Sequence, residues 1–101
     1  MNSTLPIACS LTDSEFRERR NTVLREAKQK MLEVREIADG YVYRFPSDDD
    51  SLAEIFNLVR LERKCCQFLQ FRITVEAGEG DTWLELTGAQ GTKQFLASLF
   101  D

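Results

Sequence analysis

The feature that most constrains the fold is a wide apolar stripe over residues 52–61. Apolar side chains recur there at helical spacing, at Leu52, Ile55, Phe56, Leu58, Val59 and Leu61. Ser47 and three successive aspartates precede the stripe, and such residues favour a helix N-terminus. The pattern predicts a central core helix that is capped by Ser47 and runs to about residue 68. The rest of the chain must supply a surface that covers this helix.

Strand patterns flank this helix on both sides. Residues 41–45 and 83–87 are rich in aromatic, β-branched and apolar side chains, and residues 6–11 and 71–76 alternate between apolar and polar. Residues 31–37 either prolong the preceding helix or form a strand. A two-residue turn at Asp39-Gly40 favours the strand, because this dipeptide is typical of β-hairpins. Such a hairpin would place Val34 opposite Phe45 and Ile37 near Val42.

Two further helices are predicted. Thr12 and Glu15 form a capping box that opens a helix over residues 13–28, whose thin apolar stripe predicts a largely exposed element. Its basic side chains alternate with glutamates and are therefore expected on a solvated face. These basic residues are Arg17, Arg19, Arg20, Arg25, Lys28 and, just beyond, Lys30. A loop bracketed by Gly88 and Gly91 leads into a closing helix over residues 92–99.

The resulting order is β-α-β-β-α-β-β-α in a single α+β domain spanning residues 1–101. Its first six elements are those of a ferredoxin-like β-α-β-β-α-β core, an antiparallel sheet with its helices on one face. A fifth strand and a C-terminal helix extend this core. In that topology the strand over residues 6–11 brings Cys9 to the end of the sheet where Cys65 and Cys66 lie.

Composition excludes several functions. The chain has no histidine, so Cys-His and Ser-His nucleophilic pairs and HExxH zinc sites are ruled out. Its net charge of −4 argues against nucleic-acid binding. No apolar run approaches the roughly 18 residues of a membrane span, and the N-terminal residues predict no signal peptide. We therefore expect a cytoplasmic protein whose three cysteines stay reduced and form no structural disulfide.

Glu62, Cys65 and Cys66 form the most distinctive chemical cluster, because residues three and four apart share one face of a helix. Thiolates are soft ligands for Zn(II), Hg(II) or As(III). Cys9, Cys65 and Cys66 are predicted to supply three sulfur ligands, with Glu62 as a fourth ligand or a supporting group. The leading hypothesis is thus a non-catalytic sensor, carrier or scavenger of a thiophilic metal ion such as zinc.

Two alternatives remain open. The cysteines also fit a role as small buried apolar residues, with Glu62 at the surface or paired with Arg60 or Arg63. The protein would then be an interaction module that forms a homodimer through its open sheet face, lined by Trp83, Tyr41 and Tyr43. The third hypothesis is a thiol-redox protein that uses the two adjacent thiols, although no CxxC motif supports it.

Four sequence stretches resemble a family of small bacterial cytosolic proteins for which no activity is established. These stretches are ACSL at residues 8–11, GYVYRFP at residues 40–46, LERKCCQFL at residues 61–69 and LTG at residues 86–88. The resemblance implies a bacterial cytosolic single-domain protein and supplies no catalytic residues. In this family a proline often follows the double cysteine, whereas this chain has Gln67, which leaves the helix free to continue.

Overall fold

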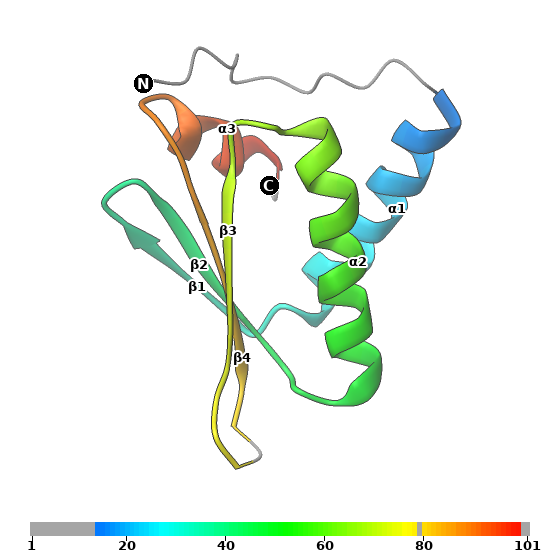
Figure 1. The fold of residues 1–101 in the computed structure, drawn as a ribbon, viewed down its shortest axis with the longest axis vertical. Coiled ribbons are helices and arrows are strands. Elements are labelled where there is room, and N and C mark those ends of the chain that lie inside the picture. Colours follow the sequence, from blue (N-terminus) through cyan, green and yellow to red (C-terminus); the bar gives the residue numbers. More distant parts are fainter. Residues whose placement is uncertain (1–13, 79, 100–101) are drawn as a thin grey trace.

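The computed structural model describes residues 14–78 and 80–99, which form an α+β fold (Figure 1). Within this part of the chain, three helices and one four-stranded antiparallel sheet are found. Their order is α1 (Ser14–Lys30), β1 (Glu33–Ile37), β2 (Gly40–Phe45), α2 (Asp49–Cys65), β3 (Gln70–Val75), β4 (Thr82–Thr87) and α3 (Thr92–Leu99). None of these helices has the length and apolar character that crossing a bilayer requires.

The strand order is β1-β2-β4-β3, with every neighbouring pair antiparallel. β4 pairs with both β2 and β3, so it holds the central position that the first strand of a ferredoxin-like sheet would occupy. The ferredoxin-like order with a fifth strand is therefore not found among the described residues. The strand predicted over residues 6–11 lies outside them. An additional strand could join this sheet only beyond β1 or beyond β3, because both sides of β2 and β4 are already paired.

The hairpin predicted between residues 31 and 45 is confirmed, but its predicted register is wrong. Val34 pairs with Tyr43 and Ile37 pairs with Gly40, so the turn consists of residues 38 and 39. Gly40 is instead the first residue of β2, where it approaches β4 closely. A Cβ atom at this position would lie 1.8 Å from the backbone oxygen of Leu86. The glycine is thus required by strand packing rather than by the turn.

The central helix forms as predicted, with different ends. Asp48, not Ser47, caps α2, because its Oδ2 accepts a hydrogen bond of 3.1 Å from the backbone nitrogen of Ser51. The helix ends at Cys65 rather than near residue 68. Cys66 has φ −117° and ψ 75°, which is outside the helical region, and its backbone nitrogen donates to the Glu62 oxygen at 2.6 Å. The chain therefore leaves the helix between the two cysteines.

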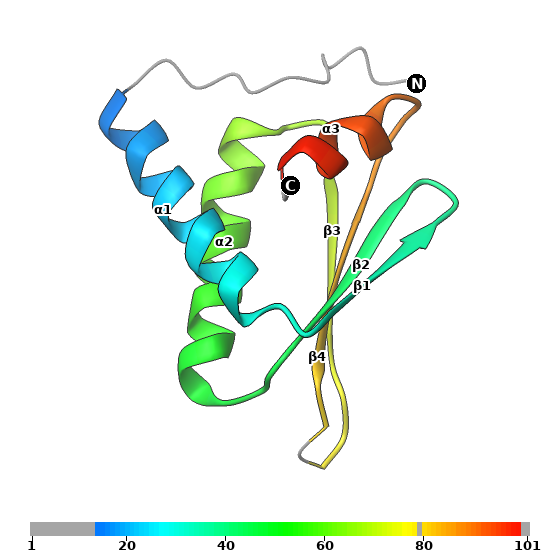
Figure 2. The ribbon, with the colours of Figure 1, turned by 180° about the vertical axis from the view of Figure 1, so that it is seen from behind.

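All three helices lie on the same side of the sheet, and α1 runs diagonally along α2 (Figures 1 and 2). The core between these layers is apolar and receives side chains from every layer. Its most deeply buried members are Tyr43, Phe45, Ile55, Leu58, Leu84, Leu86 and Leu96. Burial of such side chains supplies most of the favourable free energy of folding.

We expect Leu84→Ala to lower the free energy of unfolding by about 2–5 kcal/mol. Leu84 is fully buried in the central strand β4, so the substitution removes buried methyl groups and leaves a cavity. Urea unfolding followed by circular dichroism measures the loss. Val34→Ala is the control, since Val34 lies on the edge strand β1 and is 51% exposed. A loss of under about 1 kcal/mol at Leu84 would contradict its placement in the core.

Candidate functional site

The end of α2 carries a buried polar cluster made of Arg20, Glu62 and Cys66. Arg20 comes from α1 and shares one helix face with the buried Val23, Leu24 and Ala27, three, four and seven residues later. Glu62 shares the buried face of α2 with Leu58 and Cys65. Packing of α1 against α2 therefore brings the guanidinium of one helix to the carboxylate of the other. Glu62 is fully buried and Arg20 is 9% exposed.

The ion pair between these two residues is bidentate. Arg20 Nε donates to Glu62 Oε2, and Arg20 Nη2 donates to Glu62 Oε1 at 3.1 Å. This two-point geometry is the strong form of the arginine–carboxylate interaction. Burial is the largest single effect and lowers the pKa of Arg20, but the hydrogen bond and charge of Glu62, together with smaller contributions from Cys66, outweigh it, so the pKa lies above the ordinary value. Arg20 thus stays charged beside Glu62.

The sulfur of Cys66 contacts both members of this pair. Its Sγ lies 3.4 Å from Glu62 Oε1, to which the thiol donates, and 3.8 Å from Arg20 Nη2. Cys66 is a free cysteine with no exposed surface. Burial raises the pKa of its thiol to about 12, and the Glu62 carboxylate adds to this shift while Arg20 opposes it. At neutral pH the group is therefore an uncharged thiol.

Cys65 is fully buried on α2 and its sulfur is disulfide-bonded. The prediction that the cysteines form no disulfide therefore does not hold for Cys65. Cys9, the third predicted sulfur ligand, lies outside the described residues. Within residues 14–78 and 80–99, no three side chains of the types His, Cys, Asp or Glu gather as a metal site would require. The described chain thus contributes Glu62, Cys65 and Cys66 to one helix end.

Two aromatic side chains link the chain beyond the cysteines to the rest of the fold. The ring of Phe68 packs edge-on against Phe95 of α3, with 5.1 Å between the ring centres.

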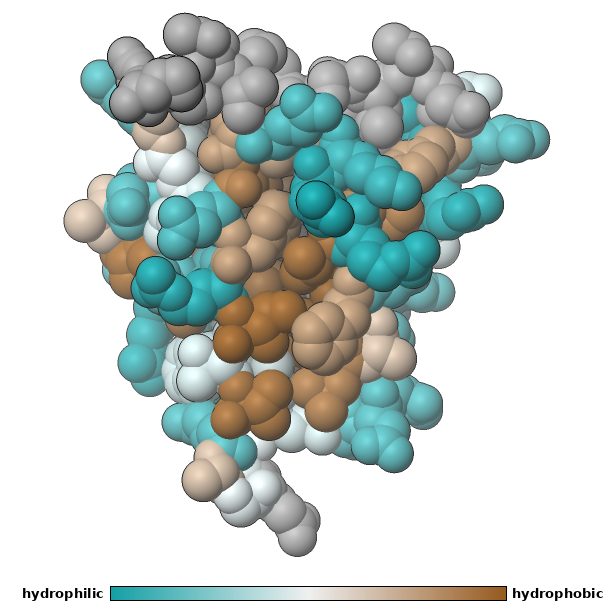
Figure 3. Space-filling view, in the orientation of Figure 1, coloured by the Kyte–Doolittle hydropathy of each residue, from teal (hydrophilic) through white to brown (hydrophobic). Residues whose placement is uncertain are grey.

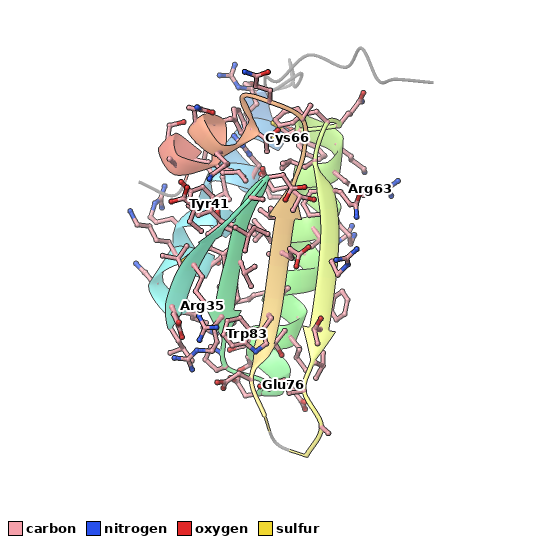
Figure 4. All side chains as sticks on the ribbon, turned by 90° about the vertical axis from the view of Figure 1, so that its left-hand side faces the viewer. Arg35, Tyr41, Arg63, Cys66, Glu76 and Trp83 are labelled. Atoms are coloured by element: carbon pink, nitrogen blue, oxygen red, sulfur yellow. The ribbon has the colours of Figure 1, made fainter. Side chains whose placement is uncertain are left out.

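A surface pocket of about 530 Å³ lies beside this segment, lined by Arg63, Lys64, Gln67, Leu69 and Phe71. Figure 4 places Cys66 at the end of the sheet over which α3 lies. The sulfur of Cys66 is shielded from solvent, and residues next to it in the sequence line a pocket with two basic side chains.

Two predictions about charged residues are wrong. Arg20 was expected on a solvated face, and Glu62 was expected at the surface or paired with Arg60 or Arg63. The sequence does contain a signal for both positions, because each is three or four residues from core apolar positions of its own helix. That spacing identifies the inward face, whereas charge alone suggests the outward one.

The predicted aromatic lining of the open sheet face is also wrong in part. Tyr43 is buried in the core at 2% exposure, and the half-buried Tyr41 packs against the same core. Trp83 lies on the open face between two arginines, with Arg35 at 4.9 Å and Arg44 at 5.8 Å from the ring centre (Figure 4). Glu33 pairs with both arginines and Asp81 also pairs with Arg44, so this face is polar and carries charges of both signs around one indole ring.

No protein-family model, curated protein or solved structure matches the chain.

We expect Glu62→Gln to destabilise the protein by about 3 kcal/mol, because it leaves the Arg20 charge buried without its partner. Urea unfolding at pH 7 in the presence of a thiol reductant measures this loss. Glu85→Gln is the matched control, since Glu85 pairs with Arg72 at an exposed site on the sheet. That control should change stability by less than about 1 kcal/mol. Equal effects of the two substitutions would argue against the buried pair.

The Cys66 thiol should also make stability depend on alkaline pH. In the unfolded chain its pKa is about 8.5, whereas in the folded protein it is about 12. Between these values the unfolded state releases the proton first, so the free energy of unfolding should fall as pH rises above about 8.5. Urea unfolding at pH 8 and pH 10 should show a larger fall for the unmodified chain than for Cys66→Ala. An identical fall in both proteins would contradict a raised thiol pKa.

Proposed function

We propose that this protein binds a soft metal or metalloid ion through cysteine sulfurs and acts as a sensor, carrier or scavenger without catalysis. Cys9, Cys65 and Cys66 would supply the sulfurs, and Cys9 enters the proposal from the sequence alone. Thiolates suit Zn(II), Hg(II) and As(III). We place the protein in the bacterial cytoplasm, where reducing conditions would open the disulfide of Cys65 and make its sulfur available as a ligand.

The observation that carries the proposal is the ion pair in contact with the Cys66 sulfur. Burying two charges is costly, and apolar residues of similar volume often serve stability equally well. A cysteine that only fills space needs no such neighbours, because free cysteine packs as a small apolar residue. The contacts of 3.4 Å and 3.8 Å from Sγ to Glu62 and Arg20 therefore support a role in which the sulfur changes its charge.

The end of α2 also suits a site that uses both adjacent sulfurs. Neighbouring residues within a helix project about 100° apart, which separates their side chains. Cys66 has already left the helix, with φ −117° and ψ 75°. Its side-chain direction is therefore not fixed by helical geometry relative to Cys65.

In this proposal Glu62 supports the site rather than ligating the ion. Both of its carboxylate oxygens accept hydrogen bonds from Arg20, and Oε1 also accepts from the Cys66 thiol. Glu62 holds the Arg20 guanidinium beside the sulfur, and that positive charge favours the thiolate form. Metal binding would release the thiol proton, so ion affinity should rise with pH.

A thiol-redox function is the second candidate, and the disulfide bond of Cys65 favours it. Here the disulfide accepts two electrons and two protons from an external thiol reductant and becomes two thiols. The adjacent residue, Cys66, carries a free thiol, which is the group that a thiol–disulfide exchange would use.

The test is native mass spectrometry of the fully reduced protein with zinc, arsenite or mercuric ion added in turn. We expect one ion per chain, and we expect Cys9→Ser, Cys65→Ser and Cys66→Ser each to abolish this complex while circular dichroism shows a folded protein. Glu62→Gln should weaken binding by about 10- to 100-fold, as changes to groups behind metal ligands do. Glu85→Gln should leave binding unchanged.

The other outcomes distinguish the remaining functions. A chain that binds none of the three ions, yet loses and regains two titratable thiols with oxidant and reductant, would support the redox function instead. A chain that does neither would show that the cysteines serve packing only, and the metal proposal would have to be dropped.

A further inference from the structure

We propose that two copies of this chain pair through the free edges of their β3 strands, forming one continuous eight-stranded sheet. This inference concerns a different surface from the cysteine cluster and does not depend on metal binding. β3 is an edge strand, because its only partner within the described sheet is β4. The surface in question, here called the β3 edge surface, consists of Phe56, Val59, Phe71, Ile73 and Val75.

The β3 edge surface is apolar and open to solvent. Phe56 and Val75 are each 52% exposed, and Val59, Phe71 and Ile73 are half-buried. Figure 3 shows a continuous apolar patch where β3 and α2 lie next to one another. Exposed apolar patches of this kind mark interaction surfaces more often than chance, and an uncovered apolar edge strand invites another strand.

Phe56 belongs to this surface because of its position on α2. Arg63 lies two helical turns later on the same face of the helix and lines the pocket that it shares with Phe71 of β3. The face that carries Phe56 and Arg63 is therefore the one next to β3. Contacts between the two helices lie elsewhere on α2, at Glu54, which pairs with Lys30, and at Glu62, which pairs with Arg20.

Backbone geometry shows which groups of β3 are available at the free edge. The Glu76 nitrogen donates to the Asp81 oxygen at 3.1 Å, so the backbone polar groups of Glu76 face β4. In an antiparallel ladder this orientation alternates along the strand. Thr74 and Arg72 therefore also face β4, whereas the N–H and C=O groups of Phe71, Ile73 and Val75 point outward. These are the groups that a second strand would bond.

Charge complementarity selects a second β3 strand, and it also selects the register. In an antiparallel pair centred on Thr74, Ile73 lies opposite Val75 of the other copy and Arg72 lies opposite Glu76 of the other copy. Ile73 and Val75 form the hydrogen-bonded pairs, while Arg72 and Glu76 form non-hydrogen-bonded pairs, in which side chains approach most closely. The twofold axis repeats each contact, as an isologous dimer requires. A register centred on Ile73 would instead oppose Arg72 to Thr74 and lose both ion pairs.

The side chains needed for these ion pairs are accessible. The Arg72 side chain is 62% exposed and reaches Glu85 across the sheet at 3.1 Å. Glu76 is exposed, and its Oε1 accepts a hydrogen bond of 3.1 Å from the Asp81 nitrogen. That hydrogen bond does not use Oε2, the second carboxylate oxygen of Glu76. On the opposite face of the joined sheet, Ile73 and Val75 of both copies would meet beneath the two Phe56 rings.

Sedimentation velocity of the full chain over a range of concentrations tests this dimer. We expect a concentration-dependent species of twice the monomer mass. Arg72→Glu and Glu76→Arg should each weaken dimerisation by about tenfold, since each opposes like charges twice across the interface. The double variant should restore dimerisation to within about threefold. Arg35→Glu is the control that should have no effect, because Arg35 lies on β1, at the opposite edge of the described sheet from β3.

Val75→Pro provides a second test. It removes an N–H that points to the free edge and leaves the β4 ladder intact, a position where proline is tolerated in strands. We expect a folded monomer. If Val75→Pro, Arg72→Glu and Glu76→Arg all dimerised as strongly as the unmodified chain, the interface would lie elsewhere, such as on the open sheet face. That result would overturn the proposal.

Hydrogen exchange of the unmodified protein covers the case in which a variant fails to fold. The Ile73 and Val75 amides should exchange fast when the protein is dilute and slowly when it is concentrated. Protection at every concentration would show that another segment of the chain covers the edge. Fast exchange at every concentration would show that neither another segment nor a second copy covers the edge. Either result would refute the dimer.

Discussion

The packing of α1 against α2 is the contact on which both the fold and the cysteine cluster depend. α1 contributes only Val23, Leu24 and Ala27 as buried apolar side chains, so its apolar stripe is narrow. Arg20 extends this stripe with a charge, and Glu62 of α2 neutralises it. The helix pair is therefore joined by apolar contacts along part of its length and by a buried ion pair near the end that carries the cysteines.

This ion pair makes the surroundings of Cys66 different from those of an ordinary core thiol. Buried charges stay ionised only when they are paired and hydrogen-bonded, and Arg20 and Glu62 meet this condition through two hydrogen bonds. The thiol beside them is held neutral by burial, while Arg20 is close enough to stabilise a thiolate. The opposing effects of burial and of Arg20 mean that a bound cation, or a change at Cys65, would alter the charge state of this sulfur.

The open face of the sheet and the β3 edge surface differ in character. The open face carries charged side chains around Trp83, where Arg35 and Arg44 approach the ring. The β3 edge surface carries exposed apolar side chains and outward-facing backbone groups. The large exposed apolar side chains of the described chain lie toward the sheet edges, at Leu32 and Val34 beside β1 and at Phe56 and Val75 beside β3. The Cys66 sulfur is fully buried and belongs to neither surface.

Local patterns determined the helices, the strands from residue 33 onward and the hairpin, because periodicity and turn residues act over a few positions. They also placed Glu62 and Cys65 on one helix face, whereas Cys66 lies just beyond the helix end. Tertiary structure alone decided that β4 takes a central position in the sheet and that Arg20 is the partner of Glu62. It also decided that Gly40 approaches the Leu86 backbone too closely for a side chain. These outcomes depend on contacts between segments tens of residues apart. The identity of a side chain gives its chemistry, but only packing determines which distant group it meets.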